Sequence, residues 1–112
     1  MNISSVYIAS DHGGYDLKSF ITKELTSMNL YKVKDLGPFN TLSVDYPEYA
    51  WNVAESVSRD RKEDKNSFGI LICGSGIGVS IAANKKEGIR AALSHNEYTA
   101  EMSRRHNCAN FF

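Results

Sequence analysis

The chain has 112 residues, of which 42% are hydrophobic and 23% charged, a composition typical of one small globular domain. Thirteen lysines and arginines balance thirteen aspartates and glutamates, so no basic excess is available to bind a nucleic-acid backbone. The chain contains no run of about eighteen apolar residues and no charged leader, so we expect a cytoplasmic protein without a membrane partner.

The first half of the chain predicts two strands and two helices. Residues 6–9 read as a buried strand, and 31–36 as a second strand that stops at Gly37. Between them, apolar side chains at helical spacing predict a helix with one apolar face, made of Leu17, Phe20, Ile21, Leu25 and Met28. Asp45 and Glu48 fit a capping box that opens a second helix. The polar stretch 59–67 is expected to be an exposed connection.

The second half repeats the alternation. Residues 68–73 form a continuous apolar run, typical of a central parallel strand, and a glycine-rich turn leads into a helix over 79–86. A fourth strand is predicted over 89–93, and a capping box of Ser94 and Glu97 opens the next helix. Residues 109–112 resemble the start of a fifth strand.

This alternation predicts an α/β protein, a three-layer Rossmann-like fold with a parallel sheet and one domain over residues 1–112. In such sheets ligands bind at the carboxyl ends of the strands. Asp11, His12, Cys73 and the glycine loop 74–78 all fall at those ends.

The glycine loop places Gly74, Gly76 and Gly78 between a buried strand and a helix start. Glycines let backbone N–H groups approach a ligand, and a helix N-terminus favours negative charge. The loop lacks the full G-x-G-x-x-G pattern and the lysine of a P-loop, so a purely structural turn is the alternative.

Cys73 lies directly before those N–H groups, a setting that favours a reactive thiolate. A buried structural cysteine is the alternative, whereas Cys108 is read as structural or incidental. No two of the three histidines have the four-residue spacing of helical metal ligands, so no metal site is predicted.

Two polar pairs are further candidates. Asp11 and His12 suit hydroxyl and phosphate binding, although a helix cap beside a solvent histidine would look the same. His106 and Asn107 follow a helix that ends in arginines, and alone they fit a cationic helix C-terminus. His95 is given no role.

With these residues in view, the chain resembles the ribose-5-phosphate isomerase B and galactose-6-phosphate isomerase family over residues 8–110. The resemblance rests on five groups of residues in order: Ser10-Asp11-His12-Gly13-Gly14, Asp45-Tyr46-Pro47, residues 69–78, residues 80–85 with 88–92, and Ser103-Arg104 with His106-Asn107.

The resemblance implies interconversion of ribose 5-phosphate and ribulose 5-phosphate in the pentose phosphate pathway, through an enediolate and without cofactor or metal. It implies that Cys73 moves the proton between C1 and C2, beside the hydroxyl of Ser75. It also implies an oxyanion hole of backbone N–H groups in residues 74–78, and a ring-opening role for His106.

For binding, the resemblance implies sugar contacts from Asp11 and Tyr46, a phosphate contact from His12 and a polar contact from Asn107. The family shares its site between subunits, so a homodimer is implied. A galactose-6-phosphate or allose-6-phosphate isomerase is the alternative within the class, and a non-catalytic sugar-phosphate-binding module is the alternative outside it.

Three departures from the family pattern stand out. Cys108 replaces the acid of the usual His-Asn-Asp motif, and Ser75 stands where threonine is common. Family members also continue through another strand and a final helix that supplies arginines for the phosphate. We therefore expect this chain to be truncated and to lack that part of the phosphate site.

Overall fold

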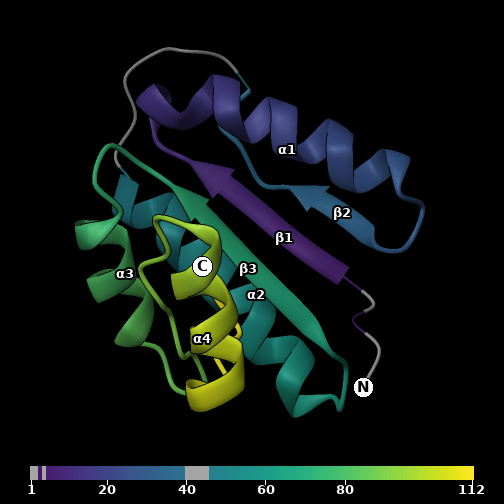
Figure 1. Ribbon diagram of the computed structural model, residues 1–112, viewed down its shortest axis with the longest axis vertical. Coiled ribbons are helices and arrows are strands. Elements are labelled where there is room, and N and C mark those ends of the chain that lie inside the picture. Colours follow the sequence, from purple (N-terminus) through teal and green to yellow (C-terminus); the bar gives the residue numbers. More distant parts are fainter. Residues whose placement is uncertain (1–2, 4, 40–45) are drawn as a thin grey trace.

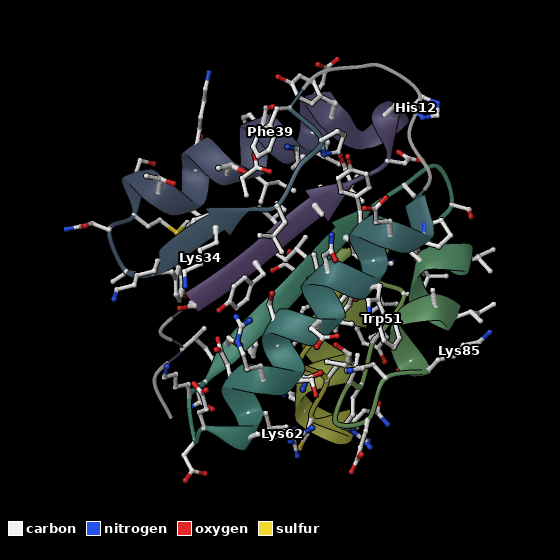
Figure 2. The ribbon with its side chains drawn as sticks, turned by 180° about the vertical axis from the view of Figure 1, so that it is seen from behind. His12, Lys34, Phe39, Trp51, Lys62 and Lys85 are labelled. Carbon is white, nitrogen blue, oxygen red and sulfur yellow. The ribbon has the colours of Figure 1, made fainter. Side chains whose placement is uncertain are left out.

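The computed structural model describes residues 3, 5–39 and 46–112, and these form a three-layer α/β fold (Figure 1). Helices α2 and α3 cover the face of the sheet seen in Figure 2, and α1 and α4 lie on the other face. The elements are β1 (Ser5–Ser10), η1 (His12–Gly14), α1 (Tyr15–Ser27), β2 (Lys32–Asp35), α2 (Tyr46–Lys62), β3 (Ser67–Ile72), α3 (Ile77–Asn84) and α4 (Glu97–Asn107). The predicted fold class is confirmed.

The sheet is parallel, with the strand order β2-β1-β3. Every residue of the central strand β1 is buried, as its continuous apolar sequence predicts. The register pairs Ile8 of β1 with Asp35 of β2 and with Ile70 of β3, so all three carboxyl ends meet at one edge. This carboxyl edge is the one to which the arrowheads point in Figure 1.

The last residues of the chain enter the sheet between β3 and the segment after α3. The backbone N–H of Gly69 donates to Asn110 O at 3.0 Å, and that of Leu71 to Phe112 O at 2.7 Å. On the other side, Ala92 N donates to Phe111 O at 2.9 Å. The expected strand start at 109–112 therefore takes a parallel position in the sheet, and Phe111 is 1% exposed.

The prediction of a strand over 89–93 is wrong in extent, because only a single bridge forms there, between Ala91 and Phe111. Side-chain amides take the place of strand partners. Arg90 N donates to Asn110 Oδ1 at 2.9 Å, and Ala91 N donates to Asn84 Oδ1 at 2.8 Å.

Three helix boundaries also differ from the sequence prediction, and α3 occupies Ile77–Asn84 instead of 79–86. Helix α2 continues to Lys62 instead of stopping before residue 59, because buried Asp60 accepts a 2.8 Å hydrogen bond from the Tyr7 hydroxyl. Helix α4 is capped by Asn96 in a capping box with Thr99, not by Ser94. The cap predicted at Asp45 lies outside the described residues.

The expected apolar face of α1 is largely on the surface. Leu17, Phe20 and Met28 are exposed, and the long side chain that α1 buries is Lys18, at 1% exposure. The main hydrophobic core lies on the opposite face of the sheet, between the strands and α2 and α3. Hydrophobic periodicity therefore located the helix but not the side chain that anchors it.

Candidate active site

Residues that follow β1 and β3 meet at the carboxyl edge of the sheet. The backbone N–H of Asp11 donates to Ile72 O at 3.0 Å, which ties the end of β1 to the residue before Cys73. The Asp11 carboxylate accepts from Gly14 N at 2.8 Å and caps η1. His12 is exposed, and Figure 2 shows it at this same edge. The sequence therefore placed these residues correctly.

The glycine loop folds back over the Cys73 thiol. Gly76 N donates to Cys73 Sγ at 3.0 Å, and Ile77 N donates to Ser75 Oγ at 3.2 Å. Both donors stand at the N-terminus of α3, where backbone N–H groups and the helix dipole favour negative charge. The Gly76 N–H therefore holds the Cys73 thiol against the loop, beside the first turn of α3.

A cavity of about 300 Å³ opens beside this thiol. Cys73, Gly74, Ser75 and Gly76 line it on one side, and the wall is otherwise largely apolar. This volume is at the lower end of the range usual for small-molecule sites. A small polar ligand here would contact the loop N–H groups and the sulfur while the apolar wall limits access of water.

Ser94 and His95 also line the cavity, although the sequence assigned Ser94 only to a helix cap and gave His95 no role. The Ser94 hydroxyl oxygen is buried and has no hydrogen-bond partner among the described residues. Both residues follow Ala92, which hydrogen-bonds to Phe111 in the sheet, and this places them at the carboxyl edge. Their position directly after a predicted strand could have indicated, from sequence alone, that they lie near the site.

Two other predicted binding positions lie on helices that start near this edge. Tyr46 is the first residue of α2, and Gly78 is the second residue of α3. Gly78 therefore belongs to the helix that follows the loop, and its N–H stands in the first turn of α3.

His106 and Asn107 do not join Cys73 in this chain. They occupy the last turn of α4, where Arg104 stacks over the ring of Phe68 at 4.7 Å, near the start of β3. The eleven residues of α4 span about 16 Å, at about 1.5 Å per residue, and lead away from the carboxyl edge. In Figure 1 the yellow end of α4 points down while the arrowheads of the strands point up. His106 is exposed there.

No cluster of three or more histidine, cysteine, aspartate or glutamate side chains within residues 3, 5–39 and 46–112 could hold a metal ion. Over the same ranges, no helix has the length and apolar character needed to cross a membrane.

The loop conformation requires glycine at position 76. Gly76 has φ of 78°, and a Cβ there would lie 2.5 Å from Leu93 Cδ1. Gly76→Ala is therefore expected to lower the free energy of unfolding by about 1–3 kcal/mol, measured by urea denaturation. Gly74→Ala is the matched control, because a Cβ at Gly74 meets nothing within 4 Å. Equal effects of the two substitutions would contradict this assignment of strain.

Comparison with known proteins gives a consistent match. A family model described as Ribose/Galactose Isomerase matches residues 6–112. The chain is 47% identical over 106 residues to the probable ribose-5-phosphate isomerase B of Mycoplasma pneumoniae, covering 94% of this chain and 66% of that relative.

Two solved structures agree with this match. A ribose-5-phosphate isomerase B of Clostridium thermocellum has a TM-score of 0.86 at 48% identity, covering 96% of this chain and 69% of that one. The Mycoplasma genitalium enzyme with bound ribulose-5-phosphate has a TM-score of 0.87 at 42% identity, covering 99% and 71%. The chain thus spans about two thirds of the length of the proteins that it matches.

Proposed function

Because the chain belongs to the ribose/galactose isomerase family, a family of isomerase enzymes, we propose that it interconverts ribose 5-phosphate and ribulose 5-phosphate. The observation that carries this proposal is the Cys73 thiol, which accepts a hydrogen bond from Gly76 N beside a 300 Å³ cavity at the carboxyl edge. A related structure that contains ribulose-5-phosphate supports the choice of a pentose.

In the proposed reaction, the Cys73 thiolate removes the proton from C2 of the open-chain aldose, and the electrons form an enediolate between C1 and C2. A proton passes from O2 to O1, and the thiol returns its proton to C1 as the C2 carbonyl forms, which gives the ketose. Loop N–H groups between Gly74 and Gly78 stabilise the developing oxyanion, and the Ser75 hydroxyl contacts it. Asp11 and Tyr46 hold sugar hydroxyls, and His12 contacts the phosphate.

Ring opening is assigned to His106, which requires a second copy of the chain. His106 and Asn107 lie at the end of α4, near the start of β3, whereas Cys73 lies at the other end of that strand. We therefore propose a homodimer in which the partner supplies the ring-opening histidine and the neighbouring asparagine to each Cys73.

The directions of the helices support this arrangement. Both α3 and α4 start at the carboxyl edge and run away from it in the same general direction (Figure 1). A twofold axis across them reverses the direction of the partner's helices, so the end of the partner's α4 lies beside the start of this α3. Exposed apolar side chains cover the proposed contact: Ile77, Ile81 and Tyr98 are 54%, 57% and 67% exposed.

Substrate choice is tested by comparing kcat/KM for ribose 5-phosphate with that for galactose 6-phosphate and allose 6-phosphate. We expect at least about a tenfold preference for the pentose, because a related structure contains ribulose-5-phosphate and a pocket fitted to a pentose binds one extra carbon unit poorly. A preference for either hexose phosphate would favour the alternative, a galactose-6-phosphate or allose-6-phosphate isomerase. Binding of all three without turnover would favour a sugar-phosphate-binding module.

A further inference from the structure

Lys18 holds a buried ammonium group between α1 and the turn after β2. Its Nζ donates to both carboxylate oxygens of Asp35, at 2.7 and 2.8 Å, and to Pro38 O at 2.5 Å. The rings of Tyr15 and Phe39 flank it, each with its centroid 5.2 Å away. The lysine side chain is 1% exposed and that of Asp35 is 25% exposed. Every proton of this ammonium has a partner.

A continuous series of hydrogen bonds leads from this ion pair to the site. Asp35 Oδ1 also accepts from Gly37 N at 2.8 Å, and Gly37 O accepts from Ser10 N at 3.1 Å. Ser10 precedes Asp11, whose own N–H bonds to Ile72 O, next to Cys73. The ion pair thus fixes the backbone at Gly37, and Gly37 holds the end of β1.

Burying an ammonium is costly, and an apolar side chain of similar volume commonly stabilises a fold as well or better. The buried charge of Lys18 is therefore better explained by a role in positioning the backbone than by a contribution to stability. An ammonium with three directed donors sets the position of the 37–38 backbone in a way that an apolar side chain does not.

We propose that Lys18 is a positioning residue for the sugar-binding edge, acting through Asp35 and Gly37 on the backbone of Ser10 and Asp11. This inference rests on the proposed function, in which Asp11 contacts a sugar hydroxyl. Residues that orient the ligands of a metal typically change its affinity by about 10–100-fold when they are replaced, and we expect an effect of similar size on sugar binding here.

The test uses Lys18→Met, which keeps the length of the side chain and removes the ammonium. At a temperature where the variant is fully folded, we expect KM for ribose 5-phosphate to rise about tenfold or more, with kcat within about threefold. Tyr7→Phe is the matched control, because it removes a buried hydrogen bond to Asp60 on the other face of the sheet. The control should lose stability without a change in KM.

A second measurement does not depend on turnover. Hydrogen exchange of the Ser10 and Gly37 amides should accelerate in Lys18→Met and not in Tyr7→Phe. Should Lys18→Met fail to fold, Asp35→Asn carries the same two expectations. Unchanged KM and unchanged exchange would overturn the positioning role, as would equal KM changes in the control. Absence of turnover in the unmodified chain would count against the proposed function alone.

Discussion

Cys73→Ala is expected to lower kcat for ribose 5-phosphate isomerisation by at least about a thousandfold, because it removes the group that we propose takes and returns the substrate proton. Binding of the sugar phosphate should persist, since the loop N–H groups and Asp11 remain in place. Turnover is followed by the conversion of aldose to ketose, and binding by isothermal titration calorimetry.

Cys108→Ala is the matched control for this experiment. Cys108 is the other free thiol, exposed and in a left-handed conformation at the end of α4, near the start of β3. The Cys108→Ala variant should retain normal turnover. This result would separate the effect of losing the proposed base from the effect of losing any thiol. Normal turnover in Cys73→Ala would show that another group moves the proton.

Mixing two inactive variants is expected to restore activity. Cys73→Ala lacks the proposed base and His106→Asn lacks the proposed ring opener, so in the proposed homodimer each variant has two defective sites. In a mixed dimer one site combines the intact Cys73 of one subunit with the intact His106 of the other. Random mixing makes half of the dimers hybrids with one working site in two, which gives about a quarter of the normal activity.

The experiment requires subunit exchange, for example by co-expression with two affinity tags. Activity is measured on the doubly purified hybrid, in which every dimer has one working site and about half of the normal activity is expected. Mixing two preparations of the same variant is the control and should restore nothing. Activity that remained absent in purified hybrids would mean that Cys73 and His106 do not meet across an interface. His106→Asn should also lose more activity on cyclic than on open-chain substrate.

The part of the site that depends on local sequence could be predicted. Cys73, its glycine loop and Asp11 are placed by strand ends and turn chemistry, which a few consecutive residues determine. The separation of His106 from Cys73 could not be predicted, because it depends on the direction in which α4 crosses the sheet. No short stretch of sequence encodes that direction.

Partners distant in sequence explain the remaining differences. Helix α2 extends because Asp60 meets Tyr7, 53 residues away, and the 89–93 segment lacks a regular ladder because Asn84 and Asn110 occupy its N–H groups. Helix α1 buries Lys18 instead of its apolar side chains because Asp35, 17 residues later, compensates the charge of the lysine. Periodicity alone does not anticipate such polar pairings.

The position of residues 110–112 in the sheet also bears on how the chain folds during synthesis. Phe111 joins β3 to the 90–92 segment, so this part of the sheet cannot form until residue 111 has left the ribosome. Until then the nascent chain exposes the free edge of β3 and the surface at Gly69 against which the Phe111 ring packs. Such an edge can pair with other chains, so we expect the nascent domain to need chaperone protection until residues 110–112 occupy it.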